Sequence, residues 1–465
     1  MPRGDADKCL HKCLRRFAVV FFAVYLWAAV MPGFALAFTL PDIYISSRAA
    51  ILVDMGAEQE LYHRNADGAE NRIPPAGLTK IMTALLAFEF AASGEGSLDG
   101  QVVVTEKAFG GLPDSAVDLQ PGETITLRSL LYCMLVALDN RSCNIIAEHV
   151  AGSSAAFVEL MNRRAAELGC LDTHFTNAHG LHNSNHYTTA GDIYRIAKEA
   201  LAYPEFMTIC DTRNTMSVSA TGSDGQTQVT HLLTVKNDMI AIRSSHNPYR
   251  YPEARGIIAG YTAEAGYCVV STAERDGRLL LCVVMGAKDN PEIRSYVEAK
   301  DLFEWGFKNF TMMTLLVVTE QLGSVKVFEG KDNDEVTLVP KAKLEALVPK
   351  TLNVQDDVEK TVKMSQVSVY APVEKGTVLG EVVVSYGDRV FDPIPLVASI
   401  KIDRDETEHM IASCQEYLSQ EWFLYALAGL AMAVLLYITF VIIYNRRRRK
   451  RGNTRQNYRG KRRRR

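Results

Sequence analysis

Three groups of residues have types and spacings that could support chemistry. They are the pair Gly77 and Lys80, the triplet Ser142-Cys143-Asn144, and the histidines His179, His182 and His186. A lysine amine can act as a base when a hydroxyl lies one turn away on the same helix face, but Gly77 has no side chain to supply one. Thr79 is no substitute, because two positions along a helix turn its side chain to another face. Lys80 therefore has no nucleophile to activate.

The hydrophobic pattern predicts the elements that position these residues. Early strands, a helical middle and late strands indicate one sheet assembled from both ends, with helices packed on it. Pro74 and Pro75 open the helix that carries Lys80, and the turn Asp276-Gly277 separates the two late strands. The predicted strands are 49–54, 60–62, 267–271 and 278–285, and the predicted helices are 81–90, 127–150 and 155–168.

The last third of the chain has a different pattern. Residues 315–402 show short strands spaced by turns, which predicts a small β-domain. Between this domain and the end of the chain, apolar residues recur on a helical period, which predicts a stalk or an interfacial helix. These apolar residues are Met410, Ile411, Cys414, Tyr417 and Leu418.

Two uncharged runs indicate export and membrane anchoring. Residues 17–38 follow a basic start and end in Ala35-Leu36-Ala37, which predicts a signal peptide cleaved after Ala37, with an uncleaved anchor as the alternative. The 23 residues of Trp422 to Tyr444 would span about 34 Å as a helix, more than the roughly 30 Å hydrocarbon core of a bilayer. We therefore predict a bacterial membrane protein with one C-terminal transmembrane helix and an extracytoplasmic main part.

Charge is distributed unevenly along the chain. The net charge of −3 includes +13 from the tail after Tyr444 and +3 from residues 1–16, so the remainder carries −19. Thirteen basic residues without an acid predict a cytoplasmic tail that touches anionic membrane lipid, and we favour this reading over a nucleic-acid-binding tail. The acidic remainder is a poor partner for anionic polymers. We expect no nucleic acid among the partners.

The nine cysteines do not indicate a disulfide framework or a zinc site. Cys9 and Cys13 lie in the signal region and Cys414 lies near the membrane, which leaves six in the folded part with no CxxC spacing. Cys268 and Cys282 flank a turn and could lie on neighbouring strands. We interpret most of the six as buried free thiols.

Many ordered matches give the chain a resemblance to a known family. From about Ser46 to Asp403, it resembles the low-molecular-mass penicillin-binding proteins, which are serine-type D-alanyl-D-alanine carboxypeptidases of peptidase family S11. The resemblance is carried by 51–54, 75–83, 130–132, 147–152, 177–190, 260–262, 265–267 and 305–307.

The resemblance implies the fold. It implies an α+β, penicillin-binding-protein/β-lactamase-like transpeptidase domain with a central antiparallel sheet between helices, followed by a small all-β domain and the C-terminal transmembrane helix. The boundaries expected are 1–37 for the signal peptide or anchor, 38–313 for the carboxypeptidase-like domain, 314–403 for the β-domain, 404–421 for the stalk, 422–444 for the membrane helix and 445–465 for the tail.

Catalysis in this family uses the motifs S-x-x-K, S-x-N and K-T-G. In the first, Gly77 occupies the serine position and Lys80 is kept. For the second, counting from 130–132 and from 147–149 gives the same register, which places Leu138 at the serine and Asn140 at the asparagine. The nearby Ser142-Cys143-Asn144 is read as a chance match.

The third motif is degraded as well. The family's lysine and threonine, which hold the terminal carboxylate of the substrate on an edge strand, fall on Ile258 and Ala259. Only Gly260 persists, and it would still let a peptide backbone approach closely.

The histidine segment also has a counterpart in the family. Residues 177–190 resemble a structural loop and helix start, with Thr188 or Thr189 as the helix cap. A zinc site would need its ligands on one face, completed by a carboxylate or thiolate from elsewhere. We read the histidines as structural and expect no metal and no cofactor.

The losses at three motifs predict a pseudoenzyme that binds peptidoglycan stem peptides or a cell-wall synthesis protein. One alternative is a working carboxypeptidase with relocated catalytic groups that trims stem peptides. Another makes the β-domain and stalk the functional part, as a spacer that docks proteins.

Overall fold

The structure is a computed structural model that describes residues 41–112, 116–243, 246–288 and 292–460. The predicted signal segment and the last five residues of the tail lie outside these ranges. Unit 1 holds the described residues up to Met313 together with Ala346–Leu352, and unit 2 holds Thr314–Glu345 and the described residues from Asn353 onward.

A five-stranded antiparallel sheet forms the centre of unit 1. Its strand order is β2-β1-β9-β8-β7, so the first two strands of the chain pair with the last three of this unit. The prediction of one sheet assembled from both ends is confirmed. Its strands are β1 (Ala49–Asp54), β2 (Gln59–Arg64), β7 (Ala254–Thr262), β8 (Gly266–Arg275) and β9 (Arg278–Ala287).

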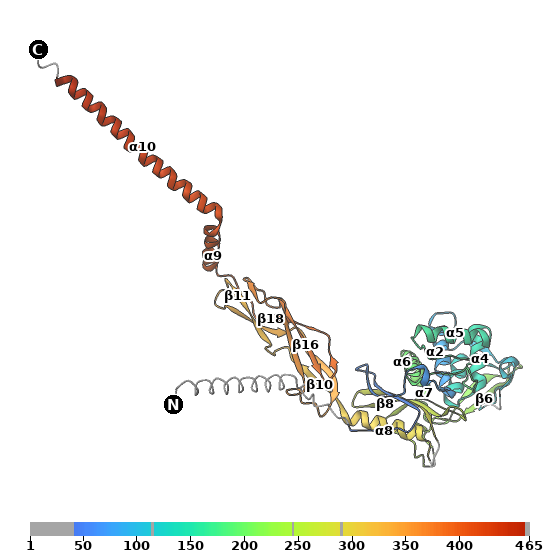
Figure 1. Ribbon diagram of the computed structural model, residues 1–465. Coiled ribbons are helices and arrows are strands. Elements are labelled where there is room, and N and C mark those ends of the chain that lie inside the picture. The colour runs from blue at the N-terminus through green and yellow to red at the C-terminus, as the bar shows by residue number, and fades with distance from the viewer. Residues whose placement is uncertain (1–40, 113–115, 244–245, 289–291, 461–465) are drawn as a thin grey trace, which may run out of the picture. The chain divides into compact units, whose positions relative to one another are not determined.

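Helices pack on both faces of this central sheet. Figure 1 shows α8 on one side of β8, and α2 and α6 on the other, so the α+β fold with a sheet between helices is confirmed. The α-helices of unit 1 are α2 (Lys80–Ala92), α3 (Leu127–Val136), α4 (Asn140–Ala151), α5 (Ser154–Glu167), α6 (Ala190–Ala200), α7 (Pro204–Cys210) and α8 (Arg294–Asn309).

One predicted helix is two helices in the structure. The apolar period over 127–150 continues through the sequence, but Leu138 has a φ of 58°, which no α-helix accommodates. Asp139 then caps α4, because its side chain accepts a hydrogen bond from the Ser142 amide. The break brings the start of α4 beside the start of α2.

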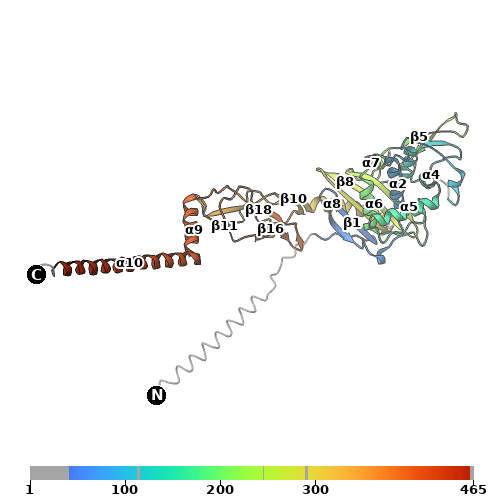
Figure 2. The same cartoon turned by 90° about the horizontal axis from the view of Figure 1, so that it is seen from above.

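A second, four-stranded sheet lies at the far end of unit 1. Its order is β3-β4-β5-β6, and Figures 1 and 2 show α2 and α7 between it and the central sheet. The sequence reading missed β5 and β6, whose buried positions alternate but are filled partly by alanine and histidine. The strands are β3 (Gln101–Val103), β4 (Thr124–Thr126), β5 (Met216–Thr221) and β6 (Gln228–Leu233).

Unit 2 begins with the predicted small β-domain. Its sheet has the order β14-β16-β18-β12-β11-β15, with β17 paired to β16. The strands β10 (Phe310–Leu316) and β13 (Leu344–Pro349), whose residues are divided between the two units, form a separate two-stranded sheet. The strands are β11 (Gly323–Phe328), β12 (Glu335–Pro340), β14 (Glu359–Met364), β15 (Ser368–Tyr370), β16 (Val378–Tyr386), β17 (Arg389–Val390) and β18 (Ile394–Ala398).

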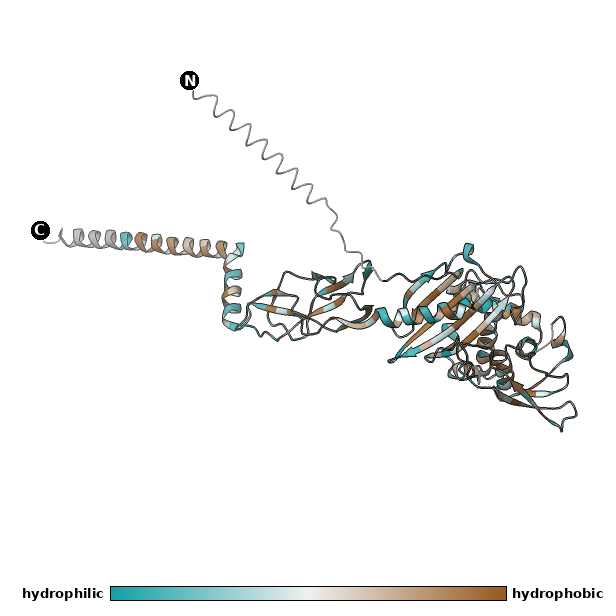
Figure 3. Cartoon of the chain, turned by 90° about the horizontal axis from the view of Figure 1, so that it is seen from below, coloured by the Kyte–Doolittle hydropathy of each residue, from teal (hydrophilic) through white to brown (hydrophobic). Residues whose placement is uncertain are grey.

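Two helices follow the β-domain in unit 2. In α9 (Glu406–Ser419), Met410, Ile411, Tyr417 and Leu418 are exposed. In α10 (Glu421–Gly460), residues Glu421–Arg448 are long and apolar enough to cross a membrane, and Figure 3 shows the hydrophobic colour along this part. This helix is a candidate membrane span by length and composition.

Candidate functional site

The first motif position lies at the junction of a tight turn and a long helix. Ala76–Thr79 form the 3₁₀ turn η2, and α2 begins directly at Lys80. Lys80 is 2% exposed, and its Nζ donates to Asn140 Oδ1 at 2.7 Å and to the His179 carbonyl at 2.8 Å. Burial lowers the pKa of Lys80, and nearby Cys143 and Asp139 offset part of this effect. The amine is therefore held by two oxygens of the protein.

The second motif position faces Lys80 from the start of α4. Asn140, the residue at the predicted asparagine position, supplies the acceptor for the lysine amine. Ser142 is buried instead, and its Oγ donates to Asp139 Oδ2 at 2.6 Å within the same helix turn. The Ser142 hydroxyl thus stabilises the helix start, as a chance S-x-N match would allow.

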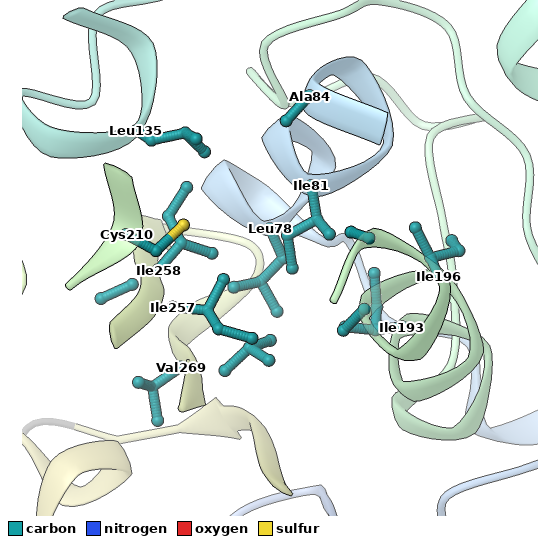
Figure 4. Close-up of a cluster of buried hydrophobic side chains, with 14 of the residues drawn as sticks. Leu78, Ile81, Ala84, Leu135, Ile193, Ile196, Cys210, Ile257, Ile258 and Val269 are labelled. Atoms are coloured by element: carbon teal, nitrogen blue, oxygen red, sulfur yellow. The ribbon is translucent and has the colours of Figure 1, made fainter. Parts of the chain in front are cut away.

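The third motif position lies on β7, which is an edge strand of the central sheet. Ile258 is fully buried in an apolar cluster with Leu78, Leu135 and Cys210 (Figure 4). Ala259 is almost fully buried and has no side-chain polar atom. Neither of these two side chains offers a cation or a hydroxyl.

Gly77 and Gly260 meet across the gap between η2 and β7. A Cβ built on Gly260 would lie 2.5 Å from the Gly77 nitrogen, so this position accepts only glycine without a shift of the backbone. A Cβ built on Gly77 would lie 3.2 Å from the Ala259 carbonyl oxygen, which is tight but needs a shift of only a few tenths of an ångström. The turn could therefore accept a small side chain at position 77.

Two residues beside the first and second motif positions have unusual backbone conformations. Ala76, directly before Gly77, has a φ of 49°, and Leu138, at the predicted serine position, has a φ of 58°. Non-glycine residues in this region cost on the order of 1 kcal/mol or more and cluster at functional sites. Both strained residues therefore lie at, or directly before, the positions that the sequence assigns to the first and second motifs.

The histidine segment, residues 177–190, packs against the turn η2 that carries Gly77. Thr176 N donates to His186 Nδ1 at 3.2 Å, so the ring's Nε2–H points to Thr79 Oγ1, 3.0 Å away. Gly180 packs so closely on η2 that a Cβ there would lie 1.8 Å from the Ala76 carbonyl oxygen. Thr189 caps α6 by accepting from Asp192 N, as predicted. The segment therefore supports the turn that carries Gly77.

A metal site is not formed by these histidines. His186 uses both ring nitrogens in hydrogen bonds to threonines, and His179 Nδ1 accepts from the Leu181 amide at 3.1 Å. In the part of the chain that the structure describes, no group of three His, Cys, Asp or Glu side chains is placed to hold a metal ion.

Burial makes this segment sensitive to acid. It lowers the pKa of His186 to about 3 and that of His179 to about 4, with the neighbouring cationic groups adding to the effect. The unfolded chain takes up these protons near pH 6.5, so the stability they contribute is full above pH 6.5 and is lost as the pH falls toward 3 to 4.

We expect His186→Gln to reduce the slope of the unfolding free energy against pH by about 1.4 kcal/mol per pH unit between pH 6.5 and 4. Urea unfolding at a series of pH values measures this slope. The matched control is His182→Gln, because His182 lies in the same loop but is 37% exposed. An unchanged slope in His186→Gln would contradict this account of the loop.

The six cysteines of the folded part lie in unit 1 and are free, buried thiols, which confirms that reading. Cys268 and Cys282 lie on the neighbouring strands β8 and β9, as expected, but they form no disulfide.

Sequence reasoning missed one contact of the site, the hydrogen bond from Lys80 to the His179 carbonyl. A backbone carbonyl is present at every residue, so the residue type gives no signal for it.

Comparison with known proteins supports the family and the fold. Residues 37–289 match the D-alanyl-D-alanine carboxypeptidase family, peptidase S11. The chain belongs to this family. Residues 310–404 match the C-terminal domain of penicillin-binding protein 5, which accounts for the β-domain of unit 2.

The matches to similar proteins extend over most of this chain. D-alanyl-D-alanine carboxypeptidase DacF of Bacillus subtilis is 29% identical over 352 residues, which cover 76% of this chain and 85% of DacF. D-alanyl-D-alanine carboxypeptidase DacC of Escherichia coli is 25% identical over 386 residues, which cover 82% of this chain and 90% of DacC. Penicillin-binding protein 5 of Haemophilus influenzae superimposes with a TM-score of 0.56 at 24% identity, covering 79% of this chain and all of the other, and shows the shared fold.

Proposed function

We propose that this S11 family chain is a catalytically inactive homologue of the D-alanyl-D-alanine carboxypeptidases. In this proposal it is tethered to the bacterial membrane, faces the cell wall, and binds peptidoglycan stem peptides or a cell-wall synthesis protein. The observation that carries the proposal is the environment of Lys80. Its amine is bound by Asn140 and a carbonyl, and the residue one turn before it, Gly77, offers no hydroxyl.

Three further positions support inactivity independently. Leu138 takes the place of a hydroxyl that would pass on a proton, and Ile258 and Ala259 take the places of the carboxylate-binding pair. The Ile258 side chain packs in the apolar core. The position that a lysine would occupy therefore holds a buried apolar side chain. Losing the nucleophile alone costs a serine peptidase on the order of a millionfold in turnover.

The membrane tether rests on α10 and the charge of the tail. The Glu421–Arg448 part of α10 has the length and composition of a span, and the run of basic residues begins at its end, at Arg446. This order favours a cytoplasmic tail against anionic lipid and an extracytoplasmic ectodomain.

A working carboxypeptidase with relocated groups is the competing function. We expect the purified full-length chain in detergent to take up no covalent label from a fluorescent penicillin, because acylation needs a nucleophile. An active family member in the same gel is the control. Labelling of this chain that unlabelled penicillin competes away would overturn the proposal.

The ligand class is tested separately by binding. Cosedimentation of the full-length chain with isolated peptidoglycan and, in parallel, capture from membrane extracts distinguish a wall binder from a scaffold for another protein. Binding to neither would contradict the binding role while leaving the inactivity untouched.

A further inference from the structure

Arg141 is an unpaired cation at the start of α4, directly after Asn140. Other arginines of unit 1 form ion pairs, for example Arg72 with Asp172 at 2.8 Å. Within the ranges that the structure describes, no carboxylate pairs with Arg141, and its buried Nε has no hydrogen-bond partner. A buried polar atom without a partner is rare in folded proteins and points to a ligand, ion or water that completes it.

The start of a helix is an unfavourable place for this cation. The free amides of the first turn give a helix N-terminus a partial positive charge. The first turn of α4 contains no acidic residue, and the capping carboxylate of Asp139 already accepts hydrogen bonds from the Ser142 amide and hydroxyl. The charge of Arg141 therefore weakens the helix start. Residues that break a local rule of stability in this way are expected at functional sites.

The Arg141 guanidinium is nevertheless held in a fixed position. Its Cζ lies 4.6 Å from the ring centroid of Phe109, which belongs to the 3₁₀ turn η3 (Glu106–Phe109). This turn is fastened to α4, because Asn144 Nδ2 donates to the Ala108 carbonyl at 3.1 Å. The Arg141 side chain as a whole is only partly buried, so a ligand can reach it from solvent. A cation fixed before binding loses little conformational entropy when the ligand arrives.

We infer that Arg141 binds a carboxylate of the stem peptide, an inference that rests on the peptide-binding function proposed above. The site extends from Gly260 on β7, through η2 and Lys80, to Asn140 at the start of α4. The family holds the terminal carboxylate on β7, so a cation at α4 meets a carboxylate further back in an extended peptide. In a stem peptide this group is the free α-carboxylate of a γ-linked D-glutamate. A guanidinium binds a carboxylate through two parallel hydrogen bonds.

The test is the affinity of the full-length chain in detergent for the peptide L-Ala-γ-D-Glu-L-Lys-D-Ala-D-Ala, measured by isothermal titration calorimetry. The same peptide with D-isoglutamine at its second position lacks only the carboxylate in question. We expect the wild type to bind this amidated peptide about tenfold more weakly. Arg141→Gln should bind both peptides equally, at the lower affinity. Arg141→Lys keeps the charge without the planar fork and should retain part of the preference.

The matched control is Arg163→Gln, which removes the same charge from an exposed position of α5. This variant should keep the full preference for the glutamate peptide. The melting temperature of Arg141→Gln should equal or exceed that of the wild type, because the lost charge lies at the positive end of α4. A lower melting temperature together with an unchanged preference would indicate a structural role and would overturn the inference.

The peptide pair also separates this inference from the proposed function. Equal binding of the two peptides by the wild type, or a preference that Arg141→Gln retains, overturns the inference and leaves peptide binding itself standing. Binding of neither peptide overturns the inference together with the peptide-binding function on which it rests.

Discussion

Gly77→Ser is expected to remain unlabelled by a fluorescent penicillin although it restores the S-x-x-K pattern. The turn η2 can accept the side chain with a shift of a few tenths of an ångström, so the variant should fold. The acylation rate should stay at least on the order of 10³-fold below that of an active family member, because the new hydroxyl would lack the groups that pass on its proton and hold the carboxylate.

The control for this variant is Gly77→Ala, which adds the same Cβ without a hydroxyl. A melting temperature of Gly77→Ala close to that of the wild type would show that the added Cβ is tolerated, and a similar value for Gly77→Ser would show that the hydroxyl is tolerated as well. Penicillin labelling of Gly77→Ser at a rate close to that of an active member would contradict this prediction. It would show that only the nucleophile is missing and that Leu138, Ile258 and Ala259 do not slow acylation.

Ile258→Lys, the substitution that would restore the lysine of the third motif, is expected to destabilise unit 1 by about 3 kcal/mol or more. The Ile258 side chain is fully buried among Leu78, Leu135 and Cys210, so the ammonium group would enter an apolar cluster. The free energy of urea unfolding measures the loss.

Two variants serve as controls for this prediction. Ile258→Val keeps the position apolar and should cost about 0.5–1.5 kcal/mol. Tyr261→Lys places the same charge on the exposed part of β7 and should change stability by less than about 1 kcal/mol. A loss below 1 kcal/mol for Ile258→Lys would show that the position opens to solvent.

Much of the fold could be predicted from the sequence because strong patterns were present. The apolar runs at 49–54 and 278–285 indicated buried strands, and their pairing in one sheet follows from the helical segments between them. Asn140, which counting assigns to the second motif, lies with its Oδ1 2.7 Å from Lys80 Nζ, although the two residues are 60 positions apart.

Other features depended on local geometry that the pattern does not contain. The apolar period over 127–150 gives no sign of a break, because leucine at position 138 is a good helix former, yet its positive φ separates α3 from α4. The alternating signal is weakened by the small buried Ala220 in β5 and by the buried His231 in β6. Tertiary contacts decide both cases.

The most direct test of inactivity is D-alanine release from a peptide ending in D-Ala-D-Ala, because it detects hydrolysis by any arrangement of groups. The full-length chain is incubated with the peptide at neutral pH, and an active family member at the same concentration serves as the reference. We predict release no faster than in buffer, on the order of a millionfold below the reference. Release that rises in proportion to the amount of this chain, and that an inactive preparation does not show, would contradict the proposed function.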